Sequence, residues 1–282
     1  LAAVAAGKPV FCEKPLGASL EDARAMVAAA SAAGVANMIG FNYICMPAAQ
    51  LAYEMISSGE LGDIVHGRAE HTEDFLADPT EPASWRTRGC ASGTLGDLAP
   101  HIVNAVLRLA GPIDRLVADA MTAHASRPGP HDAEAVTNED QVNLLCRFQS
   151  GAMGAIYVSR VATGRKMGYG YDITGTRGAL RFDAEDQNAL WYYDCRARRG
   201  RQGFTKLLMG PEHPDFLAFV QGAGHGTGYG DQIIIEARDF LKAIESRRDV
   251  YPTFRDGLEV SRVLEAAFRS NAERSWIRLA DI

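Results

Sequence analysis

The chain has 282 residues, of which 47% are hydrophobic and 23% are charged, a composition typical of a folded globular protein that buries a sizeable core. The formal net charge of -6 argues against a nucleic-acid-binding protein, because such proteins need a basic surface. No apolar run is long enough to span a membrane and no secretory signal is visible, so we expect no membrane partner.

The five cysteines are widely spaced and odd in number, and no two of them stand at the Cys-x-x-Cys spacing of a zinc site. We therefore expect neither a metal site nor a disulfide framework. Free thiols in a reducing cytoplasm are the simplest interpretation. The residues are Cys12, Cys45, Cys90, Cys146 and Cys195.

The first forty residues alternate between helix and strand signals. An Ala-rich helix ends at Gly7, residues 9–12 form a short apolar strand, residues 19–33 form a helix that Gly34 closes, and residues 37–42 form a second strand. This order is typical of a parallel α/β sheet. Because the chain begins inside a helix, we expect it to be a fragment whose front is missing.

After residue 45 the pattern changes to many strands joined by short turns, which predicts a large, open, mainly antiparallel sheet. The predicted strands are 64–73, 116–123, 141–149, 152–160, 169–174, 179–182 and 189–193. The predicted helices are 47–57, 97–111, 231–246 and 256–274. The basic run 196–201 is interpreted as a solvated loop, because charge runs usually mark exposed surface.

These patterns predict an α/β plus α+β protein made of two parts. Residues 1–45 are interpreted as the C-terminal remnant of a dinucleotide-binding Rossmann domain, and residues 46–282 as an α+β domain for substrate binding and oligomerisation. The strands are too many for two or three helices to cover, so one face of the sheet is expected to stay partly apolar. Since large exposed apolar patches usually mark interfaces, we expect a homodimer or homotetramer.

The first candidate site motif is Glu13-Lys14-Pro15, which follows a predicted strand. In open α/β sheets, ligands bind beyond the carboxyl ends of the strands. A lysine at this point can donate hydrogen bonds and bring positive charge to a substrate hydroxyl. Taken alone, however, the three residues fit a surface lysine before a turn-forming proline better.

The second motif is a glycine-rich approach to Asp97 and His101. The two residues are four apart, so a continuous helix would place them on one face. Pro100 is compatible only with the first turn of that helix. Neutral histidine is the usual general base near neutral pH, and a neighbouring carboxylate can orient it. The alternative is that Asp97 only caps the helix and His101 is an ordinary, partly buried residue.

Together these motifs resemble the Gfo/Idh/MocA oxidoreductases, a family that includes glucose–fructose oxidoreductase, inositol dehydrogenases and many sugar dehydrogenases. The shared order is Glu-Lys-Pro after a strand, then Gly-Phe-Asn-Tyr at residues 40–43, then Gly-x-x-x-Asp-x-x-x-His at residues 93–101. Segments 172–180, 229–244 and 256–276 also resemble the family's sheet and its closing helices.

The resemblance implies reversible hydride transfer between a nicotinamide cofactor, NAD or NADP, and a secondary hydroxyl of a sugar or cyclitol. It implies that His101 is the general acid/base and that Lys14 assists proton transfer and stabilises the developing oxyanion. It also implies that Asp97 orients His101.

The same resemblance implies that Glu13 and Pro15 lie beside the nicotinamide ribose, with Asn42 close by. Family members usually bind the cofactor through Gly-x-Gly-x-x-Gly near the N-terminus, and this chain has no such motif before residue 13. Since one βαβ unit takes about 30 residues, roughly 60 or more residues are expected to be missing. We therefore expect the fragment alone to be inactive, and the residues that choose between NAD and NADP to lie outside it.

Weaker candidates for cofactor contact precede the second motif, at Trp85 and Arg86, where simple loop packing is an equal alternative. Candidates for substrate contact are three residues of the predicted sheet and one histidine of a glycine-rich loop, namely Arg160, Lys166, Tyr171 and His225. A lone histidine in a loop is more often simply exposed.

Two other functions stay open. If the 282 residues were a mature chain, it would be a non-catalytic module that uses its sheet for oligomerisation or ligand binding. A Gly-x-Gly-x-x-Gly turn upstream in the open reading frame would decide for the enzyme. Among enzymes, the substrate could instead be a dihydrodiol or a tetrapyrrole. Tetrapyrrole reduction would not require the Asp97 and His101 pair, so that pair favours a polyol.

Overall fold

The computed structural model describes all 282 residues, apart from the side chain of Cys90. Its α-helices are α1 (Ala2–Ala5), α2 (Leu20–Ala33), α3 (Pro47–Ser57), α4 (Thr94–Asp97), α5 (Ala99–Ala110), α6 (Tyr229–Ser246) and α7 (Phe254–Glu273). Its first strands are β1 (Val10–Glu13), β2 (Asn37–Gly40), β3 (Ile64–Thr72), β4 (Ile113–Met121), β5 (Ser126–Pro128), β6 (Ala133–Ala135) and β7 (Gln141–Phe148). The remaining strands are β8 (Met153–Ser159), β9 (Gly168–Gly175), β10 (Gly178–Asp183), β11 (Ala189–Asp194), β12 (Thr205–Leu208) and β13 (Ile277–Arg278).

The N-terminal part is a small parallel unit. Strands β1 and β2 pair in parallel, from Val10 opposite Asn37 to Glu13 opposite Gly40. Helix α2 crosses between them and begins at Ser19, whose side chain accepts a hydrogen bond from the Asp22 amide. The predicted helix 19–33 is thereby confirmed. The second predicted strand was too long, because a 3-10 turn, η1 (Asn42–Cys45), begins two residues after Gly40.

The larger part is a nine-stranded sheet in the order β12-β11-β10-β9-β3-β8-β7-β4-β13. Only β3 and β8 are parallel neighbours, so the predicted mainly antiparallel sheet is confirmed. Every predicted strand is present. The prediction missed β12 and β13 at the two edges and the β5–β6 hairpin, all of which are short.

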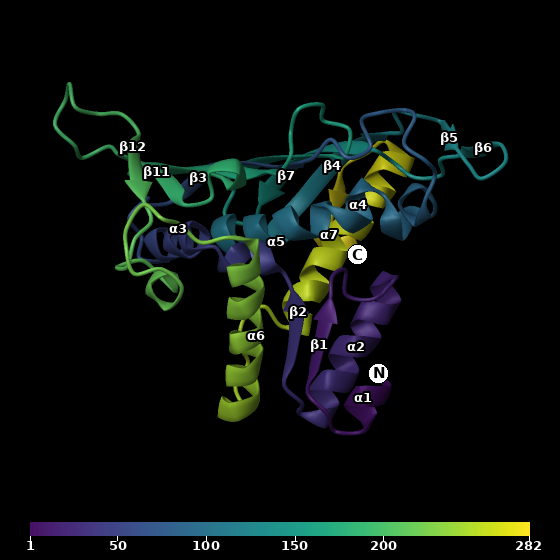
Figure 1. Ribbon diagram of the computed structural model, residues 1–282, viewed down its shortest axis with the longest axis horizontal. Helices are drawn as coiled ribbons and strands as arrows, with labels where there is room; N and C mark the ends of the chain where they lie inside the picture. The colour runs from purple at the N-terminus through teal and green to yellow at the C-terminus, as the bar shows by residue number, and fades with distance from the viewer.

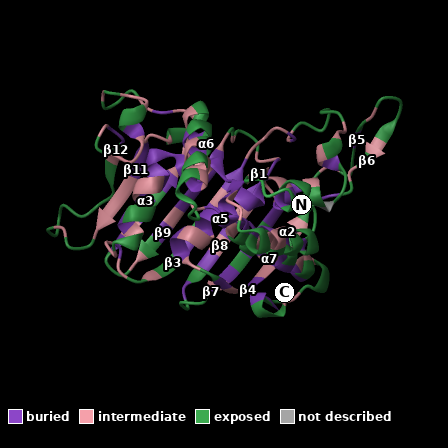
Figure 2. Ribbon diagram, turned by 90° about the horizontal axis from the view of Figure 1, so that it is seen from below, coloured by how far each residue is buried: buried purple, intermediate pink, exposed green. Residues whose placement is uncertain are grey.

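Helices cover one face of this sheet and leave the other open. Helices α3, α5 and α7 lie on the same side of the strands (Figure 1). Burial alternates along β7, where Val142, Leu144 and Cys146 are buried while Asn143 and Leu145 are exposed. Figure 2, seen from below, shows the buried positions gathered along the strands and helices of the covered side. The covered face therefore holds the core, and the open face stays available to solvent or a partner.

The last two helices return to the N-terminal unit. Helix α6 packs beside β2 and η1, and α7 packs against α2 and β2 as well as β4 and α5 (Figure 1). Two hydrogen bonds fix this return: Ile39 N donates to Pro252 O at 3.1 Å, and Phe254 N donates to Asn37 Oδ1 at 2.8 Å. These bonds hold β2, and β1 paired with it, against the start of α7.

The predicted helix 97–111 is divided in two. Helix α4 ends at Asp97 and α5 begins at Ala99, with Leu98 between them. Pro100, in the first turn of α5, has no N–H to donate to the preceding turn, so the hydrogen-bond ladder is interrupted here. The backbone N–H of His101 instead donates to Leu98 O at 3.3 Å. Asp97 and His101 therefore belong to different helical segments.

Candidate active site

Lys14 stands directly after β1 and reaches Asp97 at the end of α4. Its Nζ lies 2.7 Å from Asp97 Oδ1 and 2.6 Å from the Asp97 carbonyl oxygen, and each side chain is only 16% exposed. The other carboxylate oxygen, Oδ2, lies 3.4 Å from Arg86 Nε. Each oxygen of the Asp97 carboxylate thus faces a cation, and Lys14 keeps one N–H for a ligand.

His101 occupies the first turn of α5 and is 8% exposed. Its Nδ1 is buried without a hydrogen-bond partner, and its ring packs against Tyr43 at a centroid distance of 4.6 Å and Phe41 at 6.0 Å. Burial, followed by the charges of Lys14 and His71, holds the pKa of His101 well below its usual value. The imidazole is therefore neutral near pH 7, the form in which it can accept a proton.

The expected contact between Asp97 and His101 is absent. The Asp97 carboxylate bonds to Lys14 and Arg86, and no hydrogen bond joins it to His101 in the described part of the chain. The interruption at Leu98 breaks the continuous helix on which that expectation depended. Asp97 therefore orients Lys14, which corrects its inferred role.

Three residues without an expected role lie in this region. The Tyr43 ring, in η1, lies within 5.7 Å of the His71 ring centroid and 5.0 Å of the Tyr169 centroid. Burial, then the charge of Glu73, raise the pKa of the Tyr43 hydroxyl, so it remains a hydrogen-bond donor. His71 is fully buried, and its Nε2 lies 3.1 Å from Glu73 Oε1. In the sequence, His71 is the one polar residue that follows Gly67 and Ala69 at alternate positions of β3, and this spacing could have placed it on the buried face.

Asn42 is buried in an amide network. Its Nδ2 donates to Gln232 Oε1 at 3.0 Å, and Gln232 Nε2 donates to Gln187 Oε1 at 3.0 Å. One turn further along α6, Glu236 has a buried Oε1 without a partner. Burial and the nearby charge of Glu13 raise the pKa of Glu236 to about 7. These α6 side chains hold η1, and with it Tyr43, beside the end of β2.

The remaining cofactor candidates lie at the rim of this region. Glu13 is exposed at the end of β1, opposite Gly40, where an added Cβ would stand 3.3 Å from Glu13 Oε2. Pro15 follows Lys14 directly. Trp85 is 61% exposed and carries the Arg86 guanidinium 4.3 Å from its ring centroid. Arg86 thus contacts Asp97, while Trp85 stacks on the Arg86 guanidinium with an exposed ring.

Arg160 does not offer its side chain to a substrate. It is 1% exposed and its Nε lies 2.9 Å from Oδ1 of the equally buried Asp140. Its other donors reach Arg86 O, Ser92 O and Asn138 Oδ1. Because these contacts occupy its donors inside the protein, Arg160 anchors the segment that carries Arg86, and the inferred substrate contact is corrected.

The other three substrate candidates form no hydrogen bond with Lys14 or His101 among the described residues. Lys166 is exposed and pairs with Asp74 at 2.7 Å. Tyr171 is buried on the helix-covered face, 5.2 Å from the Phe182 ring centroid, with its hydroxyl unpaired. His225 is an exposed loop residue. Within the described residues, none of the three bonds to Lys14, Asp97 or His101, so the geometry gives no support to their inferred contacts.

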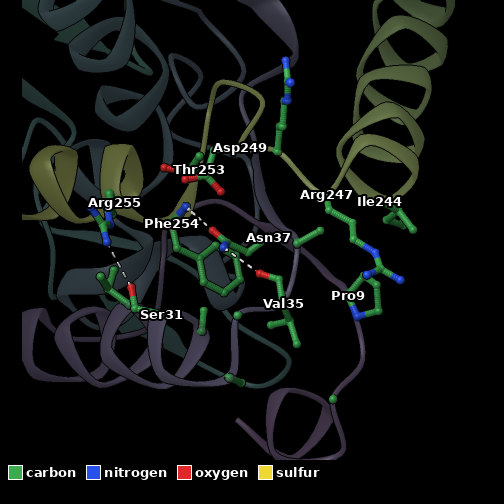
Figure 3. Close-up of a pocket in the computed structure, with 17 residues that line it drawn as sticks. Pro9, Ser31, Val35, Asn37, Ile244, Arg247, Asp249, Thr253, Phe254 and Arg255 are labelled. Carbon is green, nitrogen blue, oxygen red and sulfur yellow. Dashed lines mark hydrogen bonds between the residues drawn. The ribbon is translucent and has the colours of Figure 1, made fainter.

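A cavity of about 650 Å³ lies elsewhere (Figure 3). Figure 3 shows Pro9 and Asn37, at the amino ends of β1 and β2, facing Arg247 and Phe254, with the hydrogen bond from Phe254 N to Asn37 Oδ1. Lys14 follows the opposite, carboxyl end of β1, which is where ligands bind in open α/β sheets. This cavity therefore lies at the other end of β1 from Lys14.

The described cysteines form no disulfide. Cys12, Cys45, Cys146 and Cys195 are free, and the side chain of Cys90 lies outside the described part. Across the described residues, His, Cys, Asp and Glu side chains form no group of three or more that could hold a metal ion. Nor does any described helix have the length and apolar character needed to cross a membrane.

Two family models match this chain. Residues 1–41 match an oxidoreductase family with an NAD-binding Rossmann fold, and residues 49–181 match the GFO/IDH/MocA C-terminal domain. A levoglucosan dehydrogenase of Pseudarthrobacter phenanthrenivorans is 34% identical over 300 residues, which cover all of this chain and 76% of that protein. An inositol 2-dehydrogenase of Rhizobium meliloti is 27% identical over 281 residues, covering 98% of this chain and 74% of that protein.

Solved structures agree with these matches. An NAD binding oxidoreductase from Klebsiella pneumoniae superposes with a TM-score of 0.94 at 39% identity, over 99% of this chain and 75% of that one. A levoglucosan dehydrogenase in complex with NADH gives a TM-score of 0.95 at 35% identity, with the same coverage. The chain thus spans about three quarters of the length of the relatives it resembles.

Proposed function

This chain belongs to the Gfo/Idh/MocA family of NAD-binding oxidoreductases, and we propose that it transfers a hydride between a nicotinamide cofactor and a secondary hydroxyl of a sugar or cyclitol. The relatives named levoglucosan dehydrogenase and inositol 2-dehydrogenase support this substrate class. The observation that carries the proposal is the Lys14–Asp97 ion pair beside a neutral, buried His101. This arrangement provides a cation and a base at the carboxyl end of a strand.

The residues at the end of β1 fit the nicotinamide end of NAD or NADP. Gly40 brings the backbone of β2 close to Glu13, and Arg86, which keeps an accessible side chain, pairs with the Asp97 carboxylate that holds Lys14. When bound, the nicotinamide accepts or returns the hydride. The sequence contains no Gly-x-Gly-x-x-Gly turn, so residues 1–282 lack the usual cradle for the cofactor's pyrophosphate.

The protein's own part is proton transfer and charge stabilisation. His101 receives the hydroxyl proton at Nε2, since Nδ1 is enclosed by the protein. Lys14 donates its free N–H to the same substrate oxygen and stabilises the negative charge that develops there. Asp97 holds Lys14 in place with one carboxylate oxygen and with its backbone carbonyl.

A direct test is a dehydrogenase screen of the full-length protein across sugars, inositols, dihydrodiols and both nicotinamide cofactors. We expect reduction of one cofactor by a sugar or inositol. Turnover of a dihydrodiol alone would show that the substrate is a dihydrodiol and not a sugar or cyclitol. No turnover with any compound would favour a non-catalytic module. The Lys14, Asp97 and His101 arrangement argues against the module, because a binding surface has no need of a neutral buried base.

The open face of the sheet supports a homodimer or homotetramer. It carries exposed apolar side chains, including Val65, Leu145 and Met153. Such patches usually mark an interface, and a two-fold dimer is the commonest closed assembly. The free described cysteines support a reducing, cytoplasmic location. The two family matches also lie on either side of residue 45, which supports the proposed division into 1–45 and 46–282.

A further inference from the structure

His71 is a buried polar residue on the central strand of the covered face. It lies in β3, where it pairs with Tyr169 of β9 and Val158 of β8, and it is fully buried. Its ring centroid lies 5.7 Å from that of His101, in an edge-to-face arrangement. The ring therefore belongs to the immediate surroundings of the proposed base.

Both nitrogens of the His71 ring face hydrogen-bond acceptors. Nδ1 lies 2.9 Å from the Leu98 carbonyl oxygen, and Nε2 lies 3.1 Å from Glu73 Oε1. A carbonyl and a carboxylate only accept, whereas a neutral imidazole has a single N–H to donate. Both contacts are satisfied when the ring carries a hydrogen on each nitrogen. With Glu73 ionised, only a ring that carries both hydrogens donates to the two acceptors.

The Leu98 carbonyl lies between the segments that carry Asp97 and His101. Leu98 separates Asp97 from His101, at the point where the helix is interrupted. Its oxygen accepts the His101 backbone N–H at 3.3 Å as well as the His71 Nδ1–H. His71 is thus a side-chain partner of the same carbonyl oxygen that accepts the His101 backbone N–H.

We propose that His71 is a positioning residue: its doubly protonated ring, held by Glu73, fixes the Leu98 carbonyl between Asp97 and His101 and places a positive charge against the His101 ring. The kinetic part of this inference rests on the proposed function, and the charge state of His71 does not.

The charges around His101 come from several elements. Lys14 reaches it from the end of β1 and His71 from β3, and both disfavour a proton on His101. Tyr43 of η1 and Tyr169 of β9 also face this cluster, and burial raises the pKa of both hydroxyls, so they stay uncharged. Asp97 and Glu73 supply the negative charges and are paired with Lys14 and His71 respectively. The two cations keep His101 in its proton-accepting form.

Nuclear magnetic resonance of the histidine ring nitrogens tests the charge state directly. The protein is labelled with ¹⁵N in its histidines, and the His71 signals are assigned with the variant His71→Gln. We expect both His71 nitrogens to be protonated at about pH 7 and His101 to be neutral. A neutral His71 ring in a single tautomer would overturn the inference. This measurement needs no substrate, so it decides even if the proposed reaction fails.

The pH dependence of kcat/KM tests the consequence for His101. In His71→Gln an amide replaces the imidazolium and can still donate to Leu98 O. We expect the acidic limb of the profile to move to higher pH by roughly one unit, because a neighbouring cation is lost. Glu73→Gln, at a position where the side chain keeps 22% exposure, should move the limb in the same direction.

The matched control is Glu70→Gln. Glu70 lies on the same strand but on the open face, where it pairs with Arg165. Glu70→Gln should keep the parent's pH profile of kcat/KM. An effect seen only in Glu73→Gln would then belong to the Glu73–His71 pair and not to the loss of a nearby carboxylate in general. An unchanged pH profile in Glu73→Gln with a raised KM alone would show that Glu73 only binds substrate, and would overturn the positioning role. Thermal unfolding of each variant shows that the compared proteins are folded.

Discussion

The Lys14 ammonium lies 2.7 Å from Oδ1 of Asp97 and 2.6 Å from the Asp97 carbonyl oxygen, and these contacts join the end of β1 to the end of α4. The two residues are 83 positions apart in the sequence. Asp97 makes one contact with its side chain and the other with its backbone, so the Lys14 ammonium is held in one orientation. The proposed oxyanion contact therefore depends on Asp97 through Lys14.

Asp97→Asn should lower turnover by on the order of 10²-fold, because Lys14 loses the charged partner that aims it at the substrate oxygen. Lys14→Ala should lower it at least as much. The double variant should lose less than the product of the single losses, since the two residues act as a unit. Steady-state kinetics of the three variants measure this. Strictly multiplicative losses would show that the two residues act independently; Asp172→Asn, in an exposed ion pair of the sheet, is the control.

Arg160→Met should destabilise the protein by about 3–5 kcal/mol, because it leaves the buried Asp140 carboxylate without its partner. The control is Arg181→Met, which removes an exposed pair with Asp172 and should cost less than about 1 kcal/mol. Urea unfolding of the two variants gives the difference. Equal losses of stability would contradict the anchoring role given to Arg160.

Glu236→Gln should change the pH dependence of stability. In the folded protein the pKa of Glu236 is raised from its ordinary 4.5 to about 7, so the folded state binds the proton more tightly than the unfolded state. The parent should therefore lose stability as pH rises from about 4.5 to about 7, by about 1–3 kcal/mol. The Gln variant should lack this loss.

Unfolding free energies of parent and variant at about pH 5 and about pH 8 measure the Glu236 effect. The unfolding free energy of Glu236→Gln, relative to that of the parent, should be higher at about pH 8 than at about pH 5. Glu245→Gln, at an exposed position of the same helix, should show no such shift. A Glu236 variant that keeps the parent's pH dependence would mean that this carboxyl titrates normally.

Leu145→Glu should convert the proposed oligomer to monomer. Leu145 is 54% exposed on the open face of β7, and a charge in the centre of an apolar interface lacks a partner there. Sedimentation at micromolar concentration measures the mass. Leu241→Glu, on α6 and 59% exposed, is the control and should keep the parent's mass. A parent protein that is monomeric at the outset would exclude the interface.

Local signals were sufficient for most of the fold. Ser19 and Gly34 bound α2 because capping depends on residues at the helix ends themselves, and turn residues such as Ser150 and Gly151 separated the predicted strands that became β7 and β8. The edge strand β13 has two residues, too few for any alternation to be visible. Pro100 indicated the start of a helix, but the separate short α4 before it depends on tertiary contacts.

The site was only partly predictable, because its contacts join distant segments. Lys14, Asp97 and His101 were found from their motifs, yet the partner of Asp97 depends on where β1 ends relative to α4. Arg160 was placed at the substrate because the face of the predicted sheet was expected to wall the pocket, and its burial depends on Asp140 and the carbonyls around it. His71 gave little signal, since one histidine in a strand does not show which groups will surround it.

The central claim is that His101 transfers the proton, and the most direct measurement is turnover of His101→Ala in the full-length protein beside its affinity for the cofactor. A general base acts in the transition state, so kcat should fall by about 10²–10⁴-fold, while the dissociation constant of the cofactor stays close to that of the parent. Near-parent turnover on the best substrate would contradict the claim and leave His101 as a buried structural residue.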